Sequence, residues 1–194
     1  MGLPVRKSEQ HYTYRDYRQW PEDERWELID GVAYSMASPS TAHQHISMEL
    51  AWRLRTFLDG KPCRVLAAPL DIFFPRIREQ DEDDVDTVVQ PDIIVVCDSG
   101  KQRERGIWGA PDLAVEILSP STSRKDLNEK YRLYERSGVR EYWVIDPVGR
   151  WTQQYVLAAD GRYAPEVTLV NEGVIASAVL EGFAIEIAAL WLTA

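Results

Sequence analysis

A glutamate stands inside an apolar run at residues 111–118, Pro-Asp-Leu-Ala-Val-Glu-Ile-Leu, which predicts a buried strand. An ionised Glu116 in such a strand needs a cation, a proton or hydrogen-bond donors. A second acid, Asp92, follows Pro91 and precedes an apolar run at residues 93–96. On neighbouring strands of one sheet the two carboxylates would form a cation site, and oxygen ligands of this type suit Mg²⁺ or Mn²⁺.

A lysine follows on a predicted helix at residues 123–137. Leu127, Tyr131 and Tyr134 form the apolar stripe of this helix, and Lys130 lies on the border of that stripe. Its stem could be buried while its ammonium reaches the two carboxylates, where it would stabilise charge on a phosphate or orient the attacking water. The three residues together predict a metal-dependent phosphodiesterase site, in which the metal activates that water.

Each of the three residues also has a simpler structural interpretation. Glu116 could pair with an arginine such as Arg140. Asp92 could form a turn at the start of its strand, because it follows a proline. Lys130 could make only a surface ion pair with Asp126, four positions earlier on the helix, worth about 0.3 kcal/mol.

Further residues are candidates for auxiliary roles around the two carboxylates: His43, Glu49, Asp71 and Asp126. His43 lies near the start of a predicted helix and could reach the site, whereas Glu49 on the same helix could supply an outer-shell acid. The strand of Asp71 should neighbour that of Asp92, which makes Asp71 a stronger candidate than Glu27 in an earlier strand.

The elements expected around these residues follow an α/β order. An Asp-Gly pair between apolar runs predicts a hairpin at residues 25–36. The remaining elements are a helix at 41–58, one strand or two short ones at 64–74, the strands of Asp92 and Glu116, the helix of Lys130, and a strand at 139–146. The order helix-strand-strand-strand-helix-strand indicates a mixed sheet, with β segments added at both termini.

The composition is that of an ordinary globular protein, 45% hydrophobic and 27% charged over 194 residues. We expect one domain over 1–194, with its core at about 41–147. No apolar run is long enough to cross a membrane, and no secretory signal is seen at the N-terminus. Two cysteines are too few for a disulfide framework, which makes a cytoplasmic location the default. The net charge of −9 argues against a surface that coats DNA.

Several segments resemble the Uma family of restriction-endonuclease-like proteins, in the PD-(D/E)XK nuclease superfamily. They are Pro91-Asp92, residues 116–122, Asp126 with Lys130, and residues 138–146, and the resemblance spans roughly 10–150. The resemblance implies that Asp92 and Glu116 bind the metal and that Lys130 is the catalytic lysine. The superfamily's lysine two residues after the glutamate is replaced by Leu118, so the role would have moved to the helix, where Lys125 is a rival.

The resemblance implies a Mg²⁺- or Mn²⁺-dependent endonuclease that acts on DNA. Arg103, Arg105 and Trp108 lie in a predicted loop and could contact the substrate, with the tryptophan stacking on a base; such an aromatic could equally pack as a lid. The alternative function is a non-catalytic interaction or regulatory protein on a nuclease scaffold, suggested by the acidic charge and the missing strand lysine. The terminal β segments could form a homodimer interface.

Overall fold

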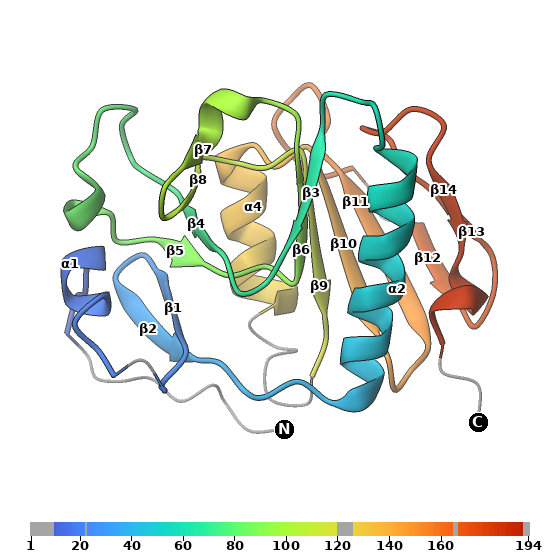
Figure 1. The fold of residues 1–194 in the computed structure, drawn as a ribbon, viewed down its shortest axis with the longest axis horizontal. Helices are drawn as coiled ribbons and strands as arrows, with labels where there is room; N and C mark the ends of the chain where they lie inside the picture. The colour runs from blue at the N-terminus through green and yellow to red at the C-terminus, as the bar shows by residue number, and fades with distance from the viewer. Residues whose placement is uncertain (1–9, 22, 120–125, 165–166, 192–194) are drawn as a thin grey trace.

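The computed structural model describes residues 10–21, 23–119, 126–164 and 167–191. In this part of the chain the backbone forms two six-stranded sheets and one two-stranded sheet. Figure 1 shows the sheet that carries the two candidate acids in the centre, with one helix in front of it and another behind. The predicted mixed α/β architecture is therefore confirmed.

The central sheet consists of strands whose bounds are β3 Arg64–Ala67, β6 Ile93–Val96, β9 Leu113–Ile117, β10 Glu141–Asp146, β11 Trp151–Val156 and β12 Val167–Val170. Their order across the sheet is β12-β11-β10-β9-β6-β3. β9 and β10 run parallel, and the other neighbouring strands run antiparallel. β6 and β9 are apolar on both faces because helices and neighbouring segments cover both faces of the sheet.

Two helices cover the central sheet. α2 (Thr41–Phe57) packs its apolar stripe on one face, and α4 (Tyr131–Ser137) packs on the other (Figure 1). α2 begins after Ser40, whose Oγ accepts a hydrogen bond from the His43 N–H at 3.2 Å. A π-helical segment, η3 (Asp126–Lys130), leads into α4. With β3, β6, β9 and β10, these helices follow the order that the sequence predicts.

A second sheet lies beside the central one and has the strand order β2-β1-β5-β4-β8-β7. Its bounds are β1 Trp26–Ile29, β2 Val32–Ser35, β4 Asp71–Phe73, β5 Val88–Val89, β7 Gln102–Arg103 and β8 Gly106–Trp108. The predicted hairpin is confirmed as β1 and β2, which pair in antiparallel register. Its turn residues Asp30 and Gly31 have φ values of 50° and 76°, in the left-handed region that this kind of hairpin turn requires.

Two expectations about the second sheet were wrong. The strand of Asp71, β4, lies between β5 and β8 rather than beside β6, because the chain leaves the central sheet after β3. The segment at 99–109 is not a simple loop. It contains a short helix, η2 (Ser99–Lys101), and the strands β7 and β8, of which β8 pairs in parallel with β4.

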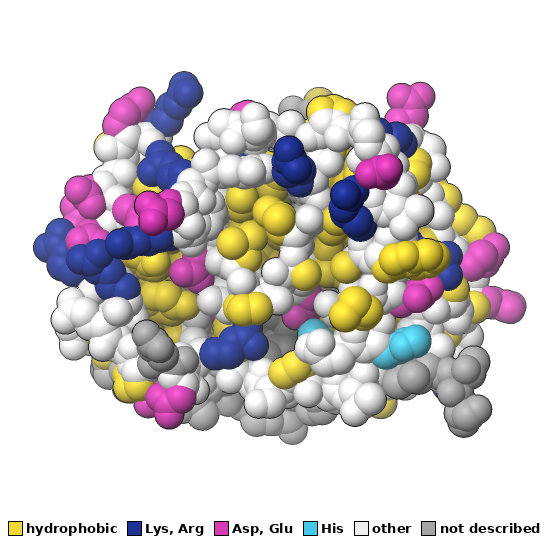
Figure 2. All heavy atoms as spheres, viewed as in Figure 1, with side chains coloured by type: hydrophobic (Ala, Val, Ile, Leu, Met, Phe, Trp, Pro, Cys, Tyr) yellow, Lys and Arg dark blue, Asp and Glu magenta, His cyan; other side chains and the backbone are white. Residues whose placement is uncertain are grey.

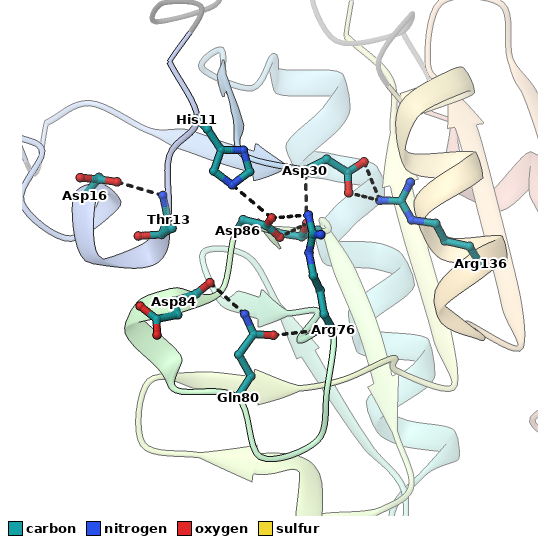
Figure 3. Close-up of polar contacts among 10 residues, drawn as sticks. His11, Thr13, Asp16, Asp30, Arg76, Gln80, Asp84, Asp86 and Arg136 are labelled. Carbon is teal, nitrogen blue, oxygen red and sulfur yellow. Dashed lines mark hydrogen bonds and ion pairs between the residues drawn. The ribbon is translucent and has the colours of Figure 1, made fainter.

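Ion pairs fix the second sheet relative to α4, as Figure 3 shows. Arg136 Nη2, on α4, lies 2.7 and 2.8 Å from the two carboxylate oxygens of Asp30 in the β1–β2 turn. Within the second sheet, Asp86 Oδ2 lies 2.6 Å from Arg76 Nη2 and 3.3 Å from His11 Nε2. The hairpin is thus held beside the helical segment that carries Lys130.

Shorter elements complete the described chain: α1 Tyr14–Tyr17, η1 Glu82–Asp84, β13 Val174–Ala176, β14 Ala184–Glu186 and η4 Ile187–Leu190. The C-terminal segments pack against the side of the central sheet that carries α2, and Ile175, Phe183 and Ile187 join that core. They therefore cover the sheet and α2, one of the two arrangements that their apolar pattern allows.

A single disulfide joins Cys63 and Cys97, with an S–S distance of 2.05 Å. The two cysteines flank the paired strands β3 and β6, so the bond links the ends of neighbouring strands. The cysteine count alone did not predict this pairing. Among the described helices, none has the length and apolar character that a membrane crossing requires.

Candidate active site

The two candidate acids meet at one end of the central sheet. β6 and β9 are antiparallel neighbours, with Ile93 opposite Val115. Asp92, directly before β6, accepts a hydrogen bond at its Oδ2 from the Ile117 N–H at 2.7 Å. The structure therefore places Asp92 beside the residue that follows Glu116, so both acids lie on adjoining strands.

Glu116 is almost completely buried, with 3% of its surface exposed. Its Oε1 accepts hydrogen bonds from Lys130 Nζ and from the Tyr134 hydroxyl, each at 2.7 Å. Lys130 is 2% exposed, so the interpretation of this lysine as part of a surface ion pair was wrong. The pairing of Glu116 with Arg140 was also wrong, because Arg140 Nη1 lies 3.1 Å from Asp112.

A third carboxylate reaches the same lysine from the second sheet. Glu27, in β1, is 0% exposed, and its Oε1 lies 2.8 Å from Lys130 Nζ. The same oxygen accepts a hydrogen bond from the Gln90 N–H at 2.7 Å. The sequence analysis ranked Glu27 below Asp71, although an acid in an apolar strand is the same signal that singled out Glu116. Lys130 is thus held between two buried carboxylates from different sheets.

Tyr134 is a contact that the sequence analysis missed, because its position placed it in the apolar stripe of the helix. Burial raises the pKa of its hydroxyl well above the ordinary value, and the carboxylates of Glu116 and Glu27 raise it further. The phenol therefore stays protonated and acts as a donor to Glu116. A tyrosine on an apolar helix face beside a predicted buried acid is the signal that could have identified it.

His43 reaches the same region from the first turn of α2. The residue is 8% exposed, and its Nε2 lies 3.2 Å from Asp92 Oδ2. Its other ring nitrogen, Nδ1, is buried without a hydrogen-bond partner. A buried, unsatisfied imidazole nitrogen is unusual away from functional sites.

These side chains line a cavity of about 310 Å³. Figure 2 shows the corresponding face of the molecule, which is hollowed between the start of α2 and the β1–β2 hairpin, with charged and hydrophobic side chains around the hollow. The polar residues of the lining are Arg25, His43, Gln44, Ser47, Gln90, Asp92, Glu116, Ser119 and Lys130.

The donors in the cavity suit a hard divalent cation. No group of three or more His, Cys, Asp or Glu residues that could hold a metal ion occurs among the residues that the structure describes. Mg²⁺ is usually bound by one or two carboxylates, with water and substrate phosphate as its other ligands. Asp92 and Glu116, which both line the cavity, therefore fit a Mg²⁺ or Mn²⁺ ion.

The other candidate acids lie apart from the two carboxylates. Asp71 Oδ1 accepts hydrogen bonds from Gln90 Nε2 at 2.8 Å and from the Tyr17 hydroxyl at 3.4 Å. Burial raises the pKa of Asp71, and these two hydrogen bonds offset part of that effect. Glu49 Oε1 pairs with Arg53 Nη2 at 2.6 Å on α2, outside the cavity lining.

Two residues that the sequence analysis considered cannot be placed. The backbone of Asp126 belongs to η3, but its side chain lies outside the described part of the chain, as does all of Lys125. The choice between Lys130 and Lys125 as the catalytic lysine therefore rests on the observed contacts of Lys130.

The proposed substrate contacts at Arg103, Arg105 and Trp108 do not line the cavity. Trp108 is 8% exposed and packs on Phe73, while the guanidinium of Arg103 lies 3.6 Å from the ring centroid. Arg105 Nη1 lies 3.4 Å from Glu82. Trp108 is therefore a packed core residue, and the expectation that it stacks on a base was wrong because its ring is covered.

A mixed sheet with a helix on each face, and with acids at the ends of neighbouring strands, defines a restriction-endonuclease-like α/β protein. The sequence profile of the Uma2 family, described as "Putative restriction endonuclease", matches residues 14–188. The chain belongs to this family. The predicted resemblance is confirmed, and the match extends it beyond residue 150 to the C-terminal strands.

Two individual proteins illustrate the relationship. "Uncharacterized protein slr1290" of Synechocystis sp. (strain ATCC 27184 / PCC 6803 / Kazusa) is 30% identical over 132 residues, which cover 67% of this chain and 65% of that protein, or less than two thirds of its length. The crystal structure of "a putative nuclease belonging to DUF820" from Anabaena variabilis ATCC 29413 has a TM-score of 0.73 at 21% identity, covering 92% of this chain and 97% of that one. At this identity the structural likeness shows the fold alone.

Proposed function

We propose that this chain is a divalent-metal-dependent nuclease that hydrolyses phosphodiester bonds in DNA. Asp92 and Glu116 are assigned as the metal-binding carboxylates and Lys130 as the catalytic lysine. The observation that carries the proposal is that all three side chains line one cavity, with Lys130 Nζ 2.7 Å from Glu116 Oε1. The family description and the fold of the Anabaena protein, both of which name a nuclease, support the same assignment.

The protein's own contacts orient both carboxylates. The Ile117 N–H and His43 Nε2 both lie at Asp92 Oδ2, so this carboxylate is held from two sides. Lys130 and Tyr134 hold Glu116 at Oε1. Fixing the orientation in advance reduces the free energy that would otherwise be lost in ordering these side chains during the reaction.

Hydrolysis adds water across a P–O ester bond and gives a phosphate monoester and a free hydroxyl. A bound Mg²⁺ or Mn²⁺ would lower the pKa of water and offset charge on the phosphate. The ammonium of Lys130 lies on the same side of Glu116, where it can stabilise the additional negative charge of the transition state. The cavity is partly closed to solvent, which strengthens these electrostatic interactions.

The proposal is tested by incubating the purified full chain with supercoiled, linear duplex and single-stranded DNA in Mg²⁺, Mn²⁺ or EDTA. We expect cleavage only with metal, and a loss of at least about 100-fold in Glu116→Gln, in line with the effect of removing one preorganised electrostatic group. Glu49→Gln is the matched control, because Glu49 is a helix acid outside the cavity lining. Equal cleavage by wild type and Glu116→Gln would refute the assignment.

Metal binding separates the enzyme from the non-catalytic alternative. Isothermal titration calorimetry with Mg²⁺ and Mn²⁺ should detect binding to the wild type and to Glu49→Gln, and much weaker binding to Asp92→Asn. A chain that binds neither metal at millimolar concentration and cleaves no DNA would instead support an interaction protein on a nuclease scaffold.

A further inference from the structure

A second cavity, of about 360 Å³, adjoins the candidate active site. The two cavities have Arg25, Pro69 and Gln90 in common, so they share part of one wall. The far side of the second cavity is aromatic, with Tyr17, Trp20 and Trp26 in its lining. We name it the aromatic pocket, defined by Tyr17, Trp20, Trp26, Arg25 and Gln90. It lies within the size range of small-ligand sites, about 300–1,000 Å³.

The aromatic rings form walls that meet at steep angles. The ring centroids of Trp20 and Trp26 are 5.8 Å apart with planes at 70°, and those of Tyr17 and Trp20 are 5.6 Å apart at 63°. All three residues are partly exposed, unlike Trp108, whose ring is covered. Trp26 is held in place by its indole N–H, which donates to Glu24 Oε2 at 2.9 Å.

Arg25 connects this pocket to the candidate active site. Its side chain is exposed, and its Nη2 donates to Gln90 Oε1 at 2.9 Å. Because Arg25 lines both cavities, its guanidinium can contact a phosphate that enters one of them while the attached nucleoside occupies the other. Aromatic faces with an adjacent arginine are the usual recognition elements for unpaired bases.

We propose that the aromatic pocket binds one unpaired nucleobase of a nucleic-acid strand next to the phosphodiester that enters the catalytic cavity. This inference rests on the proposed nuclease function and adds a substrate preference to it. A base can enter the pocket only when it is unstacked from its neighbours, so single-stranded or locally opened DNA should be preferred over a closed duplex.

Binding is measured by fluorescence anisotropy in EDTA, where no metal-dependent cleavage occurs. The probes are a labelled oligothymidylate, a sugar-phosphate strand of equal length that lacks bases, and a labelled duplex; an oligouridylate distinguishes DNA from RNA as the source of the base. We expect the oligothymidylate to bind most tightly. Trp20→Leu and Trp26→Leu should each weaken its binding by about 5- to 150-fold, the range of stacking on one aromatic residue.

The controls distinguish stacking from a structural effect. Trp20→Phe and Trp26→Phe keep an aromatic face and should bind within about 5-fold of the wild type; they also preserve the test if a leucine variant unfolds, as shown by its thermal midpoint. Trp52→Leu changes a tryptophan that is 59% exposed on α2, outside both cavities, and should leave binding unchanged.

Leucine variants that bind the oligothymidylate as tightly as the wild type would overturn the inference, as would equal binding of the strand without bases. Failure of the nuclease assignment gives a different result. A chain that loses strand binding in Trp26→Leu but cleaves no DNA refutes only the catalytic proposal, whereas a chain that cleaves DNA and binds strands normally in all four variants refutes only the pocket.

Discussion

Replacement of Lys130 by methionine removes an ammonium that two buried carboxylates share. Lys130 Nζ lies 2.8 Å from Glu27 Oε1 and 2.7 Å from Glu116 Oε1, so these two oxygens are at most about 5.5 Å apart. At an effective dielectric constant of about 20, two unit charges at that distance repel by about 3 kcal/mol. The loss of one partner from a buried ion pair destabilises proteins by about 3–5 kcal/mol. We therefore expect Lys130→Met to lower the free energy of unfolding by about 3–5 kcal/mol.

The measurement is urea unfolding followed by circular dichroism, in EDTA at pH 8. Arg53→Met is the matched control, because it also removes a cation from an ion pair with a glutamate. The Arg53–Glu49 pair is partly exposed, with side-chain exposures of 35% and 26%, and such pairs contribute about 0–1 kcal/mol. The two variants thus compare the same chemical change at a buried and at a solvated site.

A second substitution tests the cause of the destabilisation. Adding Glu27→Gln to Lys130→Met removes one of the two charges and should restore about 3 kcal/mol, the repulsion calculated above. The reasoning is refuted if Lys130→Met costs less than about 1 kcal/mol, as expected for the control, or if Glu27→Gln destabilises the methionine variant further.

Three other substitutions test single contacts by urea unfolding. Tyr134→Phe removes a donor to the charged Glu116 and should lower stability by about 1.5–3 kcal/mol; an unchanged transition would show that the hydroxyl makes no net contribution. Glu141→Gln should cost about 1–3 kcal/mol, because an amide cannot accept from every donor, among them Ser177, that now meets the buried carboxylate, and a change within 0.5 kcal/mol would contradict this. Burial raises the pKa of Asp71, so the native state retains this proton where the unfolded chain releases it, and the wild type should lose stability relative to Asp71→Asn as pH rises above about 4. A difference between the two proteins that stays constant from pH 4 to 7 would contradict that assignment.

Local sequence patterns were sufficient to predict the elements that carry the site. The β1–β2 hairpin follows from its Asp30-Gly31 turn, and the start of α2 follows from Ser40 as a cap. The helix of Lys130 ends where Gly138 adopts a left-handed φ of 82°. Each of these signals depends on residues within a few positions of one another, so a single sequence contains all the information required.

Contacts between the two sheets could not be predicted in the same way. Glu27 and Lys130 are far apart in the sequence, and their contact depends on how the second sheet packs against η3 and α4. The position of β4 illustrates the same difficulty, because its apolar pattern suits either sheet and only the packed structure decides which strands it joins. The ranking of Asp71 above Glu27 failed for this reason.

A buried acid in an apolar strand is also an ambiguous signal. Glu141, in β10, is 0% exposed, as Glu27 is, and its oxygens accept hydrogen bonds from Trp143 Nε1, Gln154 Nε2 and the Ser177 hydroxyl. These neutral donors satisfy the carboxylate in the core, where it ties β10 to the C-terminal segment. Glu116 differs because a lysine and a tyrosine approach it and because it lines a cavity. The surroundings of each acid, rather than its burial, distinguish a candidate active-site residue from a structural one.

The predicted core at residues 41–147 leaves out part of the candidate site. Glu27 contacts Lys130 from β1, and the neighbouring Arg25 lines both the catalytic cavity and the aromatic pocket. The β1–β2 hairpin is therefore a component of the site and not an added β segment. The pair between Asp30 and Arg136 holds the turn of this hairpin to α4, so the position of the hairpin and that of Lys130 are mechanically linked. Any proposed minimal catalytic unit must accordingly include the N-terminal hairpin, because without it Lys130 would lose one of the two carboxylates that orient it.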